Sequence, residues 1–118
     1  MGTMKIKNIE TALKIFEDAA ITYSEASKKG DYKIANKNYD KVVVAAEFLK
    51  QQGAIQLVSR FLDHASPGVR NGAAAYLLPM QEQDAVRVLE AIANGPRGVH
   101  RLEAEMILSE WRKGNLKL

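Results

Sequence analysis

Residues 61–78 have the sequence FLDHASPGVRNGAAAYLL, which predicts the end of one helix, a short corner and the beginning of a second helix. Ser66 is a favourable N-cap residue, and Pro67 suits the first helical position because its missing N–H needs no acceptor there. The small residues at 72–75 let the second helix approach its neighbours closely. The apolar side chains that we expect this helix to bury are Val69, Leu77 and Leu78.

The composition is that of a helical protein. With 118 residues, 47% of them apolar, the chain is long enough for one packed core. Gly and Pro occur at spaced points rather than in tracts, which is typical of short helices joined by tight corners. We therefore predict an all-α fold and a single domain over residues 1–118, in which a helical hairpin (1–53) precedes two helix pairs (54–118).

Several classes of protein are excluded by what the sequence lacks. The absence of cysteine excludes disulfides, thiolate zinc sites and thiol nucleophiles. No apolar stretch has the length of a signal-peptide core or of the roughly 18 residues that span a bilayer, so we expect a cytoplasmic protein without a membrane partner. The net charge of +3, with acidic and basic residues interleaved, falls short of a nucleic-acid footprint.

The two parts of the chain differ in the kind of base they carry. Residues 1–53 contain nine Lys and no Arg, whereas residues 54–118 contain six Arg and two Lys. Because Arg holds carboxylates and phosphates bidentately, the second part is better equipped for a directional polar interface.

The first part is predicted to be an antiparallel hairpin. Apolar residues at spacings of three and four indicate a helix from about Lys7 to about Lys28. Gly30 ends this helix and Asp31 caps the next, which runs from Tyr32 to near Gly53.

The second part repeats with a period of 30 residues. The matching pairs are Val58 with Val88, Leu62 with Ile92, Ser66 with Pro96, Val69 with Val99, Ala74 with Ala104, and Leu78 with Leu108. Two helix pairs follow, 54–63 with 67–79 and 82–93 with 98–113. Stacked pairs place their second helices on a common surface, so we expect 31–51, 67–79 and 98–113 to lie side by side.

These residues resemble a known family. The HEAT pattern is matched closely by Leu62-Asp63, Pro67, Val69-Arg70, Ala73-Ala74 and Leu77. The wider layout is similar to a small bacterial HEAT-like family of unknown-function proteins through Lys29-Gly30-Asp31-Tyr32, Gly53, Ser66-Pro67-Gly68-Val69-Arg70 and Trp111-Arg112-Lys113-Gly114. The chain departs from the HEAT pattern at two positions. Ser66 stands where the pattern often has Asp, and in the second repeat His100 stands where the pattern has Arg. The resemblance implies a short α-solenoid of about six helices, and members of such families look like immunity proteins encoded beside bacterial toxins.

No catalytic, cofactor-binding or metal-ligating residue is predicted. His64 and His100 lie on different repeats, and neither has a second ligand at a helical spacing that suits a metal. Glu103 and Glu105 are two residues apart on a helix and face different directions, so they do not form a carboxylate pair. We therefore expect a protein that is not an enzyme.

Six residues are candidates for partner binding, on the surface that the second helices are expected to share: Tyr32, Asn36, Tyr39, Arg70, Arg101 and Trp111. Arg70 either contacts the partner or holds the corner by hydrogen bonds, and Trp111 either contacts the partner or closes the open end of the core. Met80 and Met106 are expected to fill gaps in the core.

The predicted function is stoichiometric protein binding, and the resemblance makes the partner a cognate bacterial toxin domain. One alternative is a nucleic-acid-binding module, for which Lys33, Lys37, Lys41, Arg70, Arg101 and Arg112 would have to converge. The other is a small enzyme or ligand-binding protein with a pocket between the second helices.

Overall fold

The computed structural model describes residues 5–116 and 118, and these residues form helices but no strand. The helices are α1 (Ile9–Lys29), α2 (Tyr32–Gln51), the 3₁₀ helix η1 (Ile55–Phe61), α3 (Pro67–Leu77), α4 (Glu82–Ala93) and α5 (Val99–Arg112). The radius of gyration is 13.5 Å, and a compact chain of this length is expected to have about 13.5 Å. The all-α prediction is confirmed.

Local sequence signals account for the first hairpin and for the start of α3. Gly30 ends α1 in the left-handed conformation, with φ of 74°, and the Asp31 side chain accepts a hydrogen bond from the Ile34 N–H at 3.2 Å. At the second corner the Ser66 hydroxyl accepts from the Val69 N–H at 3.4 Å, and Pro67 takes the first helical position. These caps lie where the sequence predicts them.

The helix expected over residues 54–63 is shorter and more tightly wound. It is the 3₁₀ helix η1, whose buried residues are Ile55, Val58 and Phe61. Residues spaced by three align on one face of a 3₁₀ helix, because that helix has three residues per turn. The sequence comparison took Val58 and Leu62, four residues apart, as repeating apolar positions of this helix, whereas Phe61 is buried and Leu62 only partly so.

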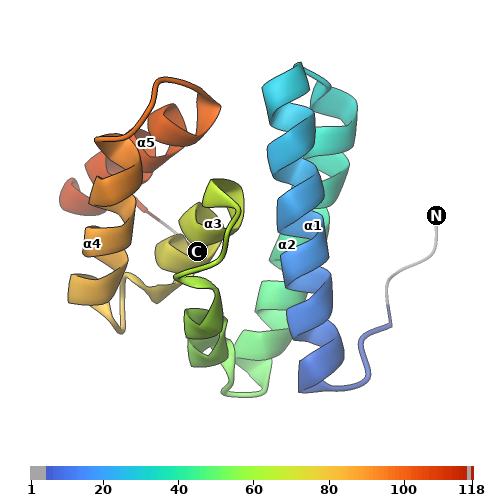
Figure 1. Ribbon diagram of the computed structural model, residues 1–118. Helices are drawn as coiled ribbons and strands as arrows, with labels where there is room; N and C mark the ends of the chain where they lie inside the picture. Colours follow the sequence, from blue (N-terminus) through green and yellow to red (C-terminus); the bar gives the residue numbers. More distant parts are fainter. Residues whose placement is uncertain (1–4, 117) are drawn as a thin grey trace.

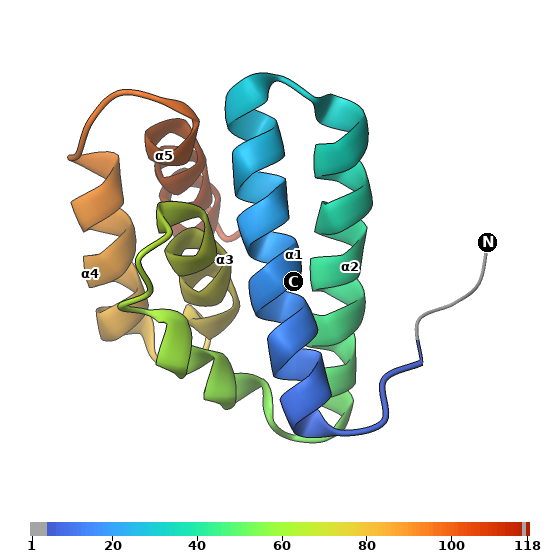
Figure 2. The ribbon, with the colours of Figure 1, turned by 45° about the vertical axis from the view of Figure 1, so that its right-hand side comes forward.

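The three second helices do not all lie side by side, which corrects the expectation from simple stacking. Helix α1 lies between α2 and α3 (Figure 2). Accordingly α2 packs on α1 and η1, whereas α3 packs on α1, η1, α4 and α5. Helices α3 and α5 are neighbours as expected, and both contact α1, so the hairpin covers the two helix pairs with its first helix (Figure 1).

One close approach fixes how α1 meets α3. Gly68, in the first turn of α3, lies directly against the buried Ser24 of α1, so that a Cβ on residue 68 would overlap the Ser24 side chain and come within 2.5 Å of its Oγ. Only glycine lets the two helices meet at this distance. Gly72, one turn further along α3, is less crowded, because a Cβ there would have the Phe16 ring edge at 3.8 Å as its nearest neighbour.

The core extends through all the helices. Its fully buried large side chains include Leu13 and Phe16 of α1, Leu49 of α2, Val58 of η1, Leu77 of α3 and Leu89 of α4. Ala74 and Ala104, which the sequence placed at close helix contacts, are also completely buried. No helix in the described part of the chain has the combined length and apolar character needed to cross a bilayer.

Replacing Gly68 with Ala is expected to destabilise the protein by about 1–3 kcal/mol, because α1 and α3 must move apart to admit a methyl group. Gly72→Ala is the matched control on the same helix. We expect it to remain within about 1 kcal/mol of the wild type, since the new methyl group fits and Ala favours a helix over Gly. Urea unfolding measures both, and equal effects of the two substitutions would contradict the proposed packing.

Candidate functional site

A groove lies between α2 and α5, with α1 and α3 as its floor. The cavity is about 180 Å³, and Glu103 is the only charged side chain among its described lining residues. Its walls are Tyr39 and Val42 of α2 and Met106 and Ile107 of α5, and its floor consists of Ala20 and Tyr23 of α1 and Gly68, Gly72, Ala75 and Tyr76 of α3. Leu116 and Leu118 complete the lining. An occupant would therefore meet a largely apolar surface.

Exposed apolar side chains continue from the groove along α5. Val99, Leu102 and Met106 are 37%, 66% and 60% exposed. Their spacings of three and four residues put them on one face of the helix, and we call this row the α5 stripe. Single exposed apolar residues are ordinary, but a row of them beside a groove is typical of an interaction surface.

A partly buried polar network borders the groove and joins three helices. The Glu103 carboxylate of α5 accepts hydrogen bonds from the Tyr23 hydroxyl of α1 and from Asn71 Nδ2 of α3, each at 3.0 Å. Asn71, which has no exposed surface, also donates to the His100 carbonyl at 3.0 Å. The His100 ring Nε2 lies 3.2 Å from Ser24 Oγ. The same α1–α3 contact that requires Gly68 thus brings these groups together.

Burial changes the acid–base properties of the network. It raises the pKa of the Glu103 carboxyl, although the hydrogen bonds from Asn71 and Tyr23 act in the opposite direction. Burial, reinforced by the nearby Glu103 carboxylate, raises the pKa of Tyr23 to about 12. The pKa of His100 is lowered by burial and then by the positive charge of Lys28. Each shift disfavours a charged form, as expected for groups removed from water.

The three candidate partner-binding residues on α2 lie on the exposed surface of this helix. Tyr39 is 46% exposed, borders the groove and packs against the Tyr23 ring with 5.8 Å between centroids. Tyr32 is 72% exposed at the start of α2, and Asn36 is exposed one turn further on. Of these three, Tyr39 is the one that the structure brings to the groove.

The two candidate arginines hold the corners of the helix pairs. Arg70 Nη1 donates to the His64 carbonyl at 2.6 Å, and Arg101 Nη1 donates to the Gly95 carbonyl at 3.3 Å. Each acceptor lies six residues before its arginine, so Arg101 is the structural counterpart of Arg70 although they are 31 residues apart. The 30-residue repeat matched Arg70 with His100 instead. Both arginines line a pocket away from the groove.

Trp111 is placed at the end of α5 against α4. Its ring is half-buried against the core, and its Nε1 donates to Glu82 Oε2 at 2.8 Å. It therefore closes this end of the helix pair, the second of the two roles considered for it. The six candidates consequently lie in separate places rather than around one cavity.

Sequence reasoning missed several residues of the site. Met106 and Met80 are 60% and 48% exposed, so the expectation that they fill gaps in the core is wrong. The spacing of the α5 stripe was visible in the sequence as a second apolar face on a helix that already buries Ala104, Ile107 and Leu108. Nothing local marked Tyr23 and Glu103 as partners, because they are 80 residues apart.

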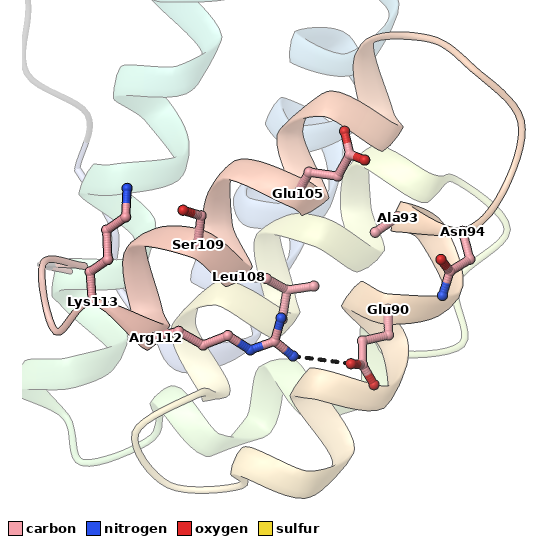
Figure 3. A pocket seen from close by; sticks show the side chains of 8 residues that line it. All are labelled: Glu90, Ala93, Asn94, Glu105, Leu108, Ser109, Arg112 and Lys113. Carbon is pink, nitrogen blue, oxygen red and sulfur yellow. Dashed lines mark hydrogen bonds and ion pairs between the residues drawn. The ribbon is translucent and has the colours of Figure 1, made fainter.

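A polar cleft of about 480 Å³ lies between α4 and α5, and Figure 3 shows its lining. Arg112 Nη2 reaches across it to Glu90 Oε2 at 3.0 Å (Figure 3). The pair ties the two helices together, and an occupant would have to displace it. Within residues 5–116 and 118, no three His, Asp or Glu side chains form a group that could hold a metal ion.

Comparisons with family models, with curated proteins and with solved structures give no match to this chain. The proposals below therefore depend on the residues and geometry of the chain itself and on the resemblance noted in its sequence.

Replacing Glu103 with Gln is expected to remove a loss of stability at higher pH. A raised pKa means that the folded protein retains a proton that the unfolded chain releases, so the wild type's free energy of unfolding falls as pH rises above about 4.5 through the raised pKa. Gln keeps an acceptor for Asn71 and stays neutral. The free energy of unfolding of Glu103→Gln minus that of the wild type should therefore increase with pH.

Urea unfolding from about pH 4 to about pH 8 measures this difference. Taking the difference cancels the contribution of His100, whose lowered pKa makes stability rise with pH. Glu105→Gln, the same change on the exposed side of α5, is the control. A difference for Glu103→Gln that stays constant over the range would contradict the role assigned to burial.

Proposed function

We propose that the protein binds one protein partner through the groove and the α5 stripe, and that the partner is a bacterial toxin domain that it neutralises. The observation that carries the binding proposal is the row of exposed apolar side chains on α5 beside an apolar groove. Burying Leu102 and Met106 in a complex removes apolar surface from water, which is the main source of affinity in protein association.

The size of the groove supports a protein partner over a small molecule. Pockets for small ligands usually measure about 300–1,000 Å³, whereas this cavity is about 180 Å³. A cavity of this size can take a single large anchor side chain. The α5 stripe and Tyr39 beside it offer the wider contact surface that a stable complex needs, in total about 1,200–2,000 Å². Glu103 offers an acceptor for a donor on the anchor residue.

The choice of a toxin as the partner is supported by the sequence resemblance. The corner Ser66–Arg70 and the wider layout are similar to HEAT-like proteins that look like immunity proteins, and we infer a HEAT-like relationship for the helix pairs of residues 54–112. A neutralising protein acts by covering the toxin's active site or substrate surface and needs no catalytic group of its own. We accordingly propose a binding role in the cytoplasm, without enzymatic activity.

A nucleic-acid partner is supported less well. Of the six basic residues that would have to converge, Arg70 and Arg101 line one pocket, and Arg112 lies in another cleft, paired with Glu90. Lys33, Lys37 and Lys41 are on α2, whose backbone lies beside α1 and η1 rather than beside α3 or α5.

The proposal is tested by substituting the α5 stripe. The chain is co-expressed with the product of the neighbouring gene as the candidate toxin, and survival and the dissociation constant are measured. The double variant Leu102→Glu/Met106→Glu should bind at least about tenfold more weakly and fail to protect, because it places two charges in the apolar contact. Both side chains are largely exposed in the free protein, so its thermal unfolding should stay close to that of the wild type.

Ile34→Glu/Val44→Glu is the matched control. These residues are 45% and 44% exposed on α2, and each is five residues from Tyr39, which places it about 140° around the helix. The control should bind within about twofold of the wild type. Failure of the wild type to bind the toxin domain, or equal losses in both variants, would refute the proposal.

A further inference from the structure

A second pocket, separate from the groove, collects positive charge. It has a volume of about 490 Å³ and lies where the end of α1, the start of α3, the end of α4 and the start of α5 meet. Its lining includes Lys28, Arg70, Arg97 and Arg101 but no acidic residue. We refer to it as the basic pocket.

These charges are not neutralised within the pocket. In the described part of the chain neither Lys28 nor Arg97 has an ion-pair or side-chain hydrogen-bond partner. Arg70 bonds only to backbone carbonyls, which leave its charge in place. Arg101 is 3.6 Å from Glu105, a contact between half-exposed side chains that compensates part of one charge.

The backbone adds donors at the same place. The first turn of α5 lines the pocket, and the first N–H groups of a helix have no acceptor within the helix. The N-cap residue is Gly98, which has no side chain to accept from them. Its φ of 150° is a conformation that residues with a side chain rarely adopt. The N-terminal end of the α5 dipole therefore adds to the positive potential of the four side chains.

The positive charges of the pocket affect the pKa of a neighbouring side chain, His100. The pKa of His100 is lowered by burial and further by Lys28 and Arg70, while Glu25 of α1 acts in the opposite direction. His100 lines the pocket, so its ring reports the local potential.

The rest of the lining is apolar. Ala91 and Ile92 of α4, Pro96 of the loop and Val99 of α5 provide surface for an uncharged part of a ligand. The volume lies within the range of small-molecule pockets, about 300–1,000 Å³, and is larger than a bare anion requires.

We propose that the basic pocket binds an organic phosphate of nucleotide size that carries at least two negative charges. The phosphates lie against Lys28, Arg97 and the first turn of α5, where the lysine acts as a point charge and the arginine as a bidentate donor. The organic part lies on the apolar lining. The proposal does not rest on the protein-binding role of the groove, because the residues lining the two cavities differ. Val99 is the one member of the α5 stripe that also lines the basic pocket.

The test uses ADP, pyrophosphate, adenosine and duplex DNA as probes. Binding to the full chain is measured by calorimetry at about 150 mM salt and, for the DNA, also at lower salt. We expect saturable binding of ADP, weaker binding of pyrophosphate and no binding of adenosine. The double variant Lys28→Gln/Arg97→Gln should weaken ADP binding by about tenfold or more, since it removes two direct charge contacts without breaking a described intramolecular bond.

Lys14→Gln/Arg87→Gln is the matched control, because it makes the same change in net charge at exposed positions elsewhere, in α1 and α4. It should leave ADP binding within about twofold of the wild type. In nuclear magnetic resonance titrations, bound ADP should raise the pKa of His100 by supplying negative charge, and the His64 ring signals should not move.

Four results would overturn the proposal. They are the absence of ADP binding, equal losses in the two double variants, pyrophosphate binding as tightly as ADP, and binding of duplex DNA that is tighter than that of ADP and steeply dependent on salt.

Discussion

The contact between Gly68 and Ser24 is the constraint on which the arrangement depends. Without a side chain at Gly68, the first turn of α3 lies against the C-terminal part of α1, and this inserts α1 between α2 and α3. The insertion brings Tyr23 within hydrogen-bonding distance of Glu103 and Ser24 within that of His100. It also separates α2 from α5 and leaves the groove between them. A methyl group at residue 68 would act on all of these features together.

The elements that sequence reasoning predicted well are encoded over a few residues. Gly30 with Asp31, and Ser66 with Pro67, determine helix ends through backbone conformation and a hydrogen bond from the N–H three residues further on. Such signals need no knowledge of the rest of the chain. Ile55, Val58 and Phe61 are spaced by three residues, as expected for the 3₁₀ helix η1. The apolar residues of the same stretch also fit an α-helical period, so the sequence did not distinguish the two kinds of helix.

The site was predicted less well, because it depends on contacts between distant segments. A glycine in the first turn of a helix does not say which helix it will approach, so the position of α1 could not be derived from Gly68. Glu103 was correctly judged unable to form a pair with Glu105, yet its real partners, Tyr23 and Asn71, are 80 and 32 residues away. The corner role of Arg70 could be considered from the sequence because its hydrogen-bond acceptor is only six residues away. Arg101 has the same role in the second corner, but it lies 31 residues after Arg70, so a repeat of 30 residues did not match the two.

The hydrogen bond between Tyr23 and Glu103 also has a consequence for how the chain folds. Helices α1 and α2 follow each other directly in the sequence and pack together, so this hairpin can form early and quickly. The groove, in contrast, needs α1 and α5 to meet across 80 residues, which carries the larger loop-closure entropy. Until α1 and α5 meet, Tyr23 and Ser24 lack their hydrogen-bond partners Glu103 and His100. The binding surface is therefore complete only after these two distant segments have packed together.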